Sequence, residues 1–450
     1  MKLAITNTMS GLKQIFVPHA DKTVTMYVCG ITPYDYAHIG HGRCYVVFDL
    51  LYRVLNLVGY KVVYCRNFTD IDDKILNRAH KELGSAALYL EIANRYIEAF
   101  NENMKSLDCI KPDYEPRVTT TIPEIITFIE GLIKKGHAYV VAGDVYYNVP
   151  SFPKYGELSK RTLDELYVGA RVEVNELKKS PYDFALWKEE DEGTFWKSPW
   201  GYGRPGWHIE CSAMSKQYLD YPIDIHGGGM DLIFPHHENE NAQSLGLYKE
   251  FVCYWVHSAF ITVNKEKMSK SLDNFITLND VFKRYDPMVL RYYYLNHYFR
   301  APLEFSWEDL ESSSKSYNRL CLQLSEHQCS SCAGQLSIES LAKTSVAKKM
   351  ISFLLDDLNV AGMFGVLFES LPELKKQEAE LCVIKRILHQ VMGFSLKPLV
   401  EEQVELTPEI KGLIAQREEA RKMKDWTRAD AIRDQLVALG YKIHDIKLKS

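Results

Sequence analysis

A strand–helix–strand pattern near the amino terminus constrains the fold of this chain more than any other feature. Residues 23–29 form an apolar run rich in β-branched residues, which predicts a strand. Apolar residues at helical spacing follow from His41 to Val58, and Gly59 is placed to end that helix. Residues 61–65 predict the next strand. Strands joined by a helix pair in parallel, so we expect an α/β fold of Rossmann type, with ligands at the carboxyl ends of its strands.

The segment from about residue 115 to 205 has a different pattern, which predicts an insertion between two halves of the sheet. A helix is predicted to begin at Thr121, which has capping-box spacing to Glu124. Residues 138–141 and 145–149 then predict a hairpin.

The sheet is predicted to resume at residues 223–226, before three glycines, and to end with one strand over 254–263. After Pro287 the pattern is helical and predicts a bundle, and a last helix is predicted over 427–439. The expected segments are the first half of the Rossmann domain at 1–114, the insertion at 115–205, the second half of the Rossmann domain at 206–286, a linking region at 287–320, a helical bundle at 321–405 and a small terminal segment at 406–450.

Composition excludes several classes of protein. No apolar run is long enough to cross a bilayer, so a cytoplasmic chain is expected and a membrane protein is not. The ten cysteines are scattered, unlike those of a small secreted disulfide scaffold, and the single Cys-x-x-Cys at Cys329 and Cys332 is interpreted as incidental. The net charge of −5 is not that of a protein that coats nucleic acid, although a local basic surface remains compatible with RNA.

Two short motifs fall at predicted strand ends and suit a nucleotide. The run His38-Ile-Gly-His41 lies where the first strand meets its helix, and free backbone N–H groups there favour phosphate. The run Lys267-Met-Ser-Lys270-Ser follows the last predicted strand and offers two ammonium groups to a departing pyrophosphate. Taken singly, the first can be a turn with two surface histidines and the second a solvated basic loop. Their order and placement together indicate adenylate chemistry.

Another group of residues has the chemistry of a metal site. His236 and Glu240 are four apart on a predicted helix, so they share a face and can bind one ion. With Cys29 at the end of the first strand and Cys211 further along, the donor set would suit zinc. Spacing alone does not select this set, because the cysteines are distant in sequence and two other potential ligands lie between His236 and Glu240. Neither HExxH nor its inverse is present in that helix, which excludes a metalloprotease.

The two motifs resemble the HIGH and KMSKS motifs of class I aminoacyl-tRNA synthetases, and the chain as a whole closely resembles the cysteinyl-tRNA synthetases. Residues 27–36, 66–74, 183–188, 206–211 and 224–240 carry the second resemblance. It implies an enzyme that activates L-cysteine with ATP and Mg²⁺ to cysteinyl-adenylate. The cysteinyl group would then pass to the 3′-terminal ribose of tRNA(Cys).

The resemblance also assigns roles to single residues. Catalysis and ATP binding fall to His38, His41, Lys267 and Lys270, and Gly227 and Asp231 join the ATP site. The zinc ligands are Cys29, Cys211, His236 and Glu240, with the substrate thiolate joining the metal directly, and the amino acid pocket includes Gly30, Thr69 and Trp207. Trp207 can instead be a core aromatic, and His226 can be a structural histidine or part of the pocket. A metal that binds sulfur in preference to oxygen would remove the need for an editing domain.

The terminal segment predicts contact with RNA. Residues 406–450 contain ten Lys and Arg against seven Asp and Glu. Arg417, Arg421, Lys424 and Arg428 recur at helical spacing and would form one basic face, and Trp426 can stack on a base or pack on the following helix. The ending lacks the tryptophan common in bacterial relatives, so no anticodon contact is carried over. A monomer is expected.

Two alternatives fit parts of the pattern. A ligase that joins activated cysteine to an amino sugar would look similar at the catalytic core, but it would not need a basic terminal helix. A non-catalytic zinc protein that binds RNA would not need the lysines at 267 and 270. The whole pattern therefore favours the tRNA enzyme.

Overall fold

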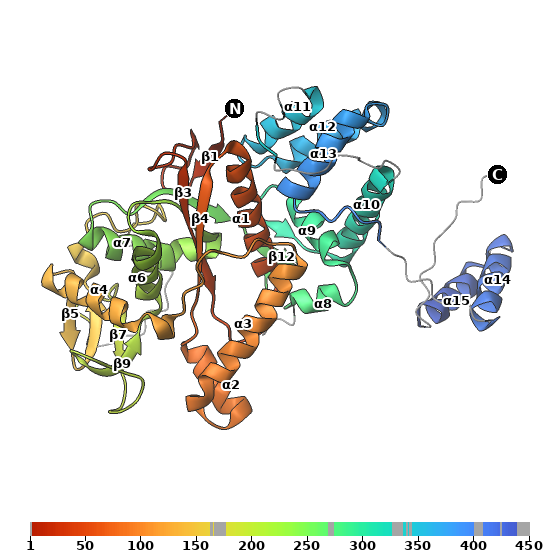
Figure 1. Ribbon diagram of the computed structural model, residues 1–450. Coiled ribbons are helices and arrows are strands. Elements are labelled where there is room, and N and C mark those ends of the chain that lie inside the picture. Colours follow the sequence, from red (N-terminus) through yellow and green to blue (C-terminus); the bar gives the residue numbers. More distant parts are fainter. Residues whose placement is uncertain are drawn as a thin grey trace. The chain divides into compact units, whose positions relative to one another are not determined.

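The computed structural model describes residues 2–162, 165, 177–268, 274–325, 336–338, 341, 344–399, 408–423 and 425–438 (Figure 1). The chain divides into two compact units, Met1–Lys397 and Pro398–Ser450, and each is described by itself.

A four-stranded parallel sheet forms the centre of the first unit. Its strand order is β11 (Val252–Ser258), β10 (Ile223–Gly229), β3 (Thr23–Ile31) and β4 (Lys61–Phe68). Every neighbouring pair is parallel, as the sequence pattern predicted. The chain moves from β3 outward to β4, and later from β10 outward to β11 in the other direction. The strand order therefore reverses between β3 and β10, the point at which sheets of this kind bind ligands.

Helices cover both faces of this sheet. Helix α1 (Ile39–Val58) connects β3 to β4, whereas α6 (Trp207–Leu219) leads into β10, and Figure 1 shows the two helices on opposite sides of the strands. The predicted helix begins at Ile39 rather than His41. It ends as predicted at Gly59, whose φ of 103° is a left-handed conformation that favours glycine.

The single strand predicted over 254–263 is wrong. Strand β11 ends at Ser258, and β12 (Ile261–Val263) belongs to another sheet of order β13-β12-β14. The reason is Arg43, a buried residue of α1 whose guanidinium donates to the carbonyls of Ala259 and Phe260 at 3.0 and 3.1 Å. These carbonyls are held by a side chain at the point where the chain leaves the central sheet. Strands β13 and β14 span Glu266–Lys267 and Leu303–Glu304.

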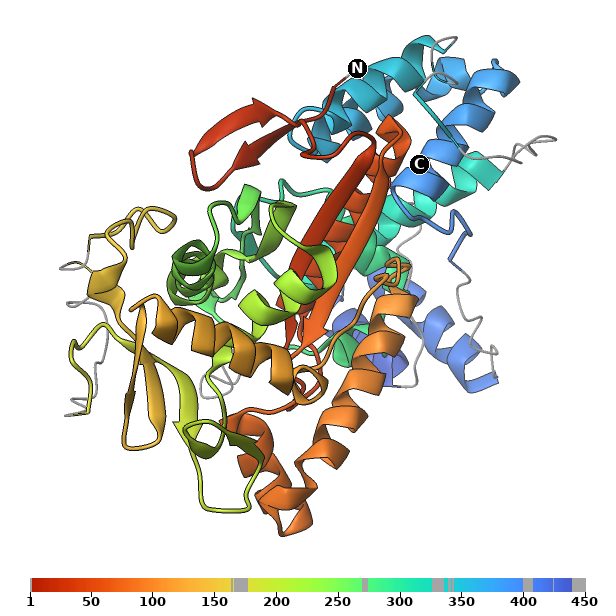
Figure 2. The ribbon, with the colours of Figure 1, turned by 60° about the vertical axis from the view of Figure 1, so that its left-hand side comes forward.

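The insertion forms its own antiparallel sheet beside helix α4 (Ile122–Lys134), coloured yellow to olive in Figure 2. The order is β5-β6-β7-β9-β8, with bounds Ala138–Val141, Asp144–Tyr147, Phe184–Glu189, Gly201–Pro205 and Trp196–Ser198. The predicted hairpin is confirmed by the β5–β6 pairing. The predicted capping box is wrong, because the Thr121 hydroxyl donates to the carbonyl of Arg117 at 2.8 Å and makes no cap bond.

The insertion is anchored to α7 (Glu238–Leu247), a helix beside the central sheet. The Tyr147 hydroxyl donates to the Ala242 carbonyl at 2.8 Å. The Ser159 amide donates to the Glu238 carboxylate at 2.7 Å, and the Tyr155 hydroxyl to the Asn239 side-chain oxygen at 2.5 Å.

The remainder of the first unit is largely helical, as predicted beyond Pro287. The helices are α2 (Asp73–Leu83), α3 (Tyr89–Ser106), α8 (Leu278–Phe282), α9 (Pro287–Leu295), α10 (Trp307–Ser325), α11 (Ser345–Leu354), α12 (Val360–Leu374) and α13 (Glu378–Arg386). A short hairpin of β1 (Ala4–Asn7) and β2 (Leu12–Ile15) precedes the sheet.

The second unit is a pair of helices, α14 (Pro408–Lys422) and α15 (Trp426–Ala438), around a small apolar core of Ile410, Ile432 and Leu436. The predicted single basic helical face is wrong, because Arg417 and Arg421 lie on α14 and Arg428 on α15. Lys424, Cys329 and Cys332 lie outside the described residues, as does the side chain of Trp426. Within the part of the chain that the structure describes, no helix is long and apolar enough to cross a membrane.

A buried ion pair joins α1 to α9. Asp49 accepts from Arg291, which is fully buried, and also from Arg53 at 2.8 Å. Arg291 donates further to the carbonyls of Leu107 and Met392, each at 2.7 Å. This guanidinium therefore connects two helices with the end of the helical bundle.

We expect Asp49→Asn to lower the free energy of unfolding by about 3–5 kcal/mol, because it leaves the Arg291 cation buried without its counter-ion. Glu373→Gln is the matched control, since the Glu373–Lys376 pair is exposed and should contribute at most about 1 kcal/mol. Urea denaturation of the full chain measures both. Equal effects of the two substitutions would contradict the assignment.

Candidate active site

The N-terminus of α1 is built by two histidines that cap each other. His38 is the N-cap residue, and its Nδ1 accepts from the His41 amide at 3.2 Å. The Nδ1 of His41 accepts in turn from the His38 amide at 3.3 Å, and the rings stack with centroids 3.6 Å apart. Since each Nδ1 is an acceptor, the proton of each neutral ring lies on Nε2. The helix start thus presents N–H donors with its positive dipole end.

Burial lowers the pKa of His41 to about 4. The ring is therefore neutral at neutral pH and acts as a hydrogen-bond donor, not as a fixed positive charge. A neutral donor fits the cap, since a doubly protonated ring could not accept the His38 amide.

Described residues in and beside the second motif lie close to the first. The Ile39 amide donates to the Ile276 carbonyl at 3.1 Å, and the Leu278 amide to the Ala37 carbonyl at 2.8 Å. A Cβ on Gly40 would lie 3.4 Å from the Met268 methyl group. The structure therefore brings the residues on both sides of the lysine-rich loop against the histidine motif. Lys267 is in β13, but its side chain and all of Lys270 lie outside the described residues.

The glycines at the end of β10 allow close packing. A Cβ on Gly227 would lie 2.2 Å from the Phe48 ring of α1, so no side chain fits there. Asp231 follows the glycines and is exposed. Both residues lie at the carboxyl end of the sheet, where α1 also begins.

Cys29, Cys211, His236 and Glu240 are brought together at the reversal of strand order, and all four are buried. Cys29 Sγ lies 3.7 Å from Cys211 Sγ and 3.4 Å from Glu240 Oε1, and His236 Nε2 lies 3.1 Å from the same oxygen. A tetrahedral ion with Zn–S bonds of about 2.3 Å would hold two sulfurs about 3.7 Å apart. The spacing and the donor types therefore fit a single tetrahedral metal ion.

The electrostatics of this cluster favour a cation. Burial, together with the neighbouring thiol and carboxylate, raises the pKa of Cys29 well above its usual value, and burial also raises the pKa of Cys211. Burial lowers the pKa of His236 well below its usual value. The two thiols and the imidazole are thus neutral without a metal, and a bound cation would favour the thiolates.

Two further histidines orient the cluster, and the sequence did not single them out. His208 Nδ1 lies 3.0 Å from His236 Nδ1, and His257 Nε2 lies 2.8 Å from His237 Nδ1. Burial lowers the pKa of each partner, His208 and His257, to about 3. His208 is one turn before Cys211, which was a usable signal. The position of His257 depends on the register of β11 against β10, where it pairs with Gly228.

The predicted amino acid pocket lies beside the cluster. The Trp207 ring is 40 % exposed and lies 4.3 Å from the His236 ring, so it is not a core aromatic. Thr69 is buried, and its hydroxyl donates at 2.8 Å to Glu210, a buried carboxyl that the sequence did not single out. A Cβ on Gly30 would overlap the Asn67 carbonyl oxygen at 1.5 Å, which explains the glycine.

Comparison with known proteins gives matches along the whole chain. A family described as "tRNA synthetases class I (C) catalytic domain" matches residues 15–315, and one described as "Cysteinyl-tRNA ligase anticodon binding domain" matches residues 403–449. A cysteine–tRNA ligase of Pelobacter propionicus is 45% identical, covering 99% of this chain and 98% of the relative. One of Anoxybacillus flavithermus is 46% identical with the same coverage.

Solved structures show the fold alone. Methionyl-tRNA synthetase of Mycobacterium tuberculosis with methionyl-adenylate has a TM-score of 0.57 at 12% identity, covering 83% of this chain and 92% of that one. The LeuRS–tRNA–LeuAMS complex of Agrobacterium radiobacter has a TM-score of 0.57 at 11% identity and covers 84% of each chain. The predicted Rossmann-type fold is confirmed.

We expect His41 to titrate near pH 4, which NMR of its ring protons can measure, with the resonance assigned through His41→Asn. Because the pKa is below the usual 6.5, protonation favours the unfolded chain. The stability gained from the neutral ring is present above about pH 6.5 and lost as the pH falls toward 4. A midpoint near 6.5 would contradict the capping role of a neutral ring.

Proposed function

The chain belongs to the cysteine–tRNA ligase family of class I synthetases, and from this we propose how its residues activate L-cysteine with ATP and charge tRNA(Cys). The observation that carries the proposal is the cluster of two thiols, an imidazole and a carboxylate beside the start of α1. A nucleotide site and a thiol-selective site would thereby adjoin at one edge of the sheet.

Activation needs positioning and charge neutralisation but no nucleophile from the protein. The cysteine carboxylate attacks the α-phosphate of ATP, an oxygen–phosphorus bond forms, and pyrophosphate leaves. His38 and His41 donate hydrogen bonds from their Nε2–H groups to phosphate oxygens beside the N-terminus of α1. Lys267 and Lys270 neutralise the departing pyrophosphate, together with Mg²⁺. Gly227 admits the adenosine, and Asp231 binds its ribose.

Cys29, Cys211, His236 and Glu240 would hold one zinc ion. Zinc supplies a Lewis acid that binds a thiolate far better than a hydroxyl, which separates cysteine from serine. His208 orients the imidazole of His236 through their ring nitrogens, as outer-shell partners of metal ligands commonly do. When bound, the zinc ion would take the substrate thiolate as a further ligand.

The rest of the amino acid is enclosed by protein groups. Trp207 covers His236 from the exposed side, and Gly30 lets the backbone approach the substrate. Glu210 fixes the hydroxyl of Thr69 toward the pocket. These contacts would orient the carboxylate of the bound cysteine toward ATP.

Transfer to tRNA uses the helical parts of the chain. We assign contact with the anticodon side of the tRNA to the bundle at 321–405 and to the terminal segment at 406–450. The linking region at 287–320 would contact the tRNA stem. Arg417, Arg421 and Arg428 give the terminal segment cationic groups for phosphates. An amino-sugar ligase and a non-catalytic RNA-binding protein are not favoured, because the matched cysteine–tRNA ligases extend over 99% of the chain. A cytoplasmic site of action follows from the proposed acceptor.

Cysteine-dependent exchange of pyrophosphate into ATP by the zinc-loaded chain tests activation, and charging of purified tRNA(Cys) tests transfer. We expect both activities. Exchange without charging would support the amino-sugar alternative, and an absence of exchange would contradict the enzyme.

Cys29→Ser should abolish exchange or raise the KM for cysteine by at least about 100-fold. Replacing a residue that only contacts a metal ligand already costs up to about 100-fold in metal affinity or activity, and Cys29 is proposed as a ligand itself. ATP binding, followed by equilibrium dialysis, should change little. Cys253→Ser is the matched control, since that thiol is half-buried on β11 and is not among the candidate ligands. Unchanged exchange in metal-free protein would contradict the role of zinc.

A further inference from the structure

Arg43 ties both ends of the segment that carries the second motif to helix α1. Its Nη1 donates to the carbonyls at 259–260, where the chain leaves β11. Its Nη2 donates to the carbonyls of Tyr298 at 3.0 Å and Ala301 at 2.7 Å, just before β14. Residues 261–297 lie between these two pairs of carbonyls. Strand β12 within them pairs with β13, where the second motif begins, and with β14.

The first turns of α1 carry the first motif and pack against the same segment. The Tyr294 hydroxyl, on α9, donates to the Ile39 carbonyl at 2.7 Å. A Cβ on Gly42 would lie 2.7 Å from the Leu278 side chain of α8 and 2.9 Å from the Tyr294 oxygen, so no side chain fits there. The start of α1 and this segment therefore fit closely, with Arg43 at their junction.

The charge of Arg43 has no counter-ion among the described residues. Arg43 is 1 % exposed, and its hydrogen bonds go to backbone carbonyls, whereas the buried Arg291 is paired with Asp49. Nε of Arg43 is buried without an acceptor in the described part of the chain. Burial lowers the pKa of Arg43 to about 10, so the group is still charged at neutral pH. A buried charge of this kind costs stability, which is typical of a group with a functional role.

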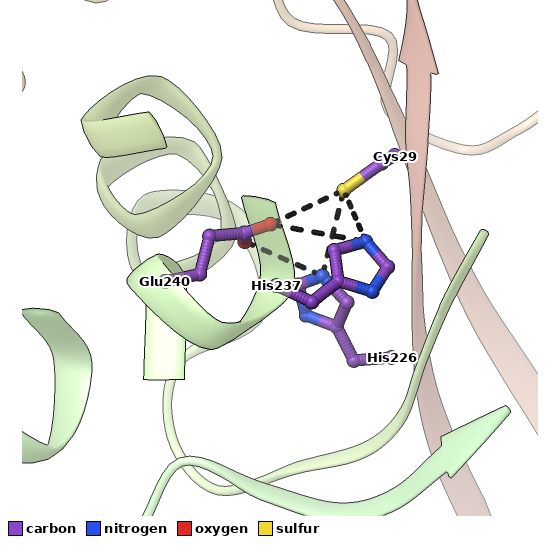
Figure 3. Close-up of side chains that lie close together, drawn as sticks. All are labelled: Cys29, His226, His237 and Glu240. Atoms are coloured by element: carbon purple, nitrogen blue, oxygen red, sulfur yellow. Dashed lines mark hydrogen bonds and ion pairs between the residues drawn. The ribbon is translucent and has the colours of Figure 1, made fainter. Parts of the chain in front are cut away.

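The metal cluster is held by other elements. Cys29 Sγ lies 3.2 Å from His237 Nε2, and Glu240 Oε2 lies 3.3 Å from His226 Nε2 (Figure 3). These residues come from β3, β10, α7 and the turn before α7, whereas Arg43 donates to the connections after β11 and before β14. Arg43 can thus be altered while the groups that bind the thiol keep their contacts.

We propose that Arg43 is a positioning residue for the activation of cysteine, because it fixes the start of the second motif relative to the first. This inference rests on the proposed function and extends it. The second motif acts on the phosphates that the first motif binds, and a displacement of about 1 Å between such groups can cost about 100-fold in rate. The planar guanidinium, with its donors in a fixed fork, reaches both pairs of carbonyls at once. A lysine keeps the charge but offers one ammonium, which reaches only one pair.

Arg43→Lys in the zinc-loaded full chain tests the proposal. The kcat of cysteine-dependent pyrophosphate exchange should fall by about 100-fold. The KM for cysteine and the zinc content should change little, because the metal cluster keeps its contacts. The amides of Ile39 and Leu278, which donate to the carbonyls of Ile276 and Ala37, should exchange faster with deuterium, since these bonds join the start of α1 to the segment. Mass spectrometry of the peptides that contain them measures this.

Arg291→Lys is the matched control, since Arg291 is also fully buried and donates to two backbone carbonyls. It should lower the melting temperature and leave kcat per folded chain nearly unchanged. The role of Arg43 would be overturned by an unchanged kcat in Arg43→Lys, by an equal loss in both variants, or by an Arg43→Lys chain that circular dichroism shows to be unfolded. An absence of exchange in the parent chain would instead overturn the proposed function, and this role with it.

Discussion

The parallel pairing of β3 with β10 is the constraint on which the site depends. It sets Tyr27 opposite His226 and Val28 opposite Gly227, so that Cys29 emerges at the reversal of strand order. Helix α6 brings Cys211 to this point, α7 brings Glu240, and the turn before α7 at Ile233–His237 brings His236. Helix α1 begins at the same edge. The nucleotide motif and the thiol cluster are neighbours because a doubly wound sheet directs its strand ends to one side.

The cluster also carries an electrostatic cost that a bound metal ion would offset. Two thiols, a carboxylate and several imidazoles are buried together, and burial disfavours the charged forms of Cys29, Cys211 and His236. A divalent ion would reverse this preference and release the thiol protons, so metal binding would stabilise this part of the fold. In the proposed function, selection of a thiol substrate and stabilisation of the pocket would draw on the same ligands.

Local signals predicted most of the central fold, and tertiary contacts account for the errors. Gly59 fixed the end of α1 because a left-handed residue closes a helix regardless of its surroundings. The break after Ser258 was not predictable, since it depends on a guanidinium from Arg43 more than two hundred residues earlier. Thr121 had the residue type of a cap, but its hydroxyl found another acceptor. The four candidate metal ligands were chosen through a family resemblance, whereas His257 required the strand register.

The anchoring of the insertion to α7 has a mechanical consequence. Glu238 and Asn239 accept hydrogen bonds from the loop at residues 155–159, and the next residue of the helix is Glu240, a candidate metal ligand. Packed elements tend to shift as bodies rather than deform. The insertion and the candidate metal ligand Glu240 are therefore coupled through two consecutive residues of one helix.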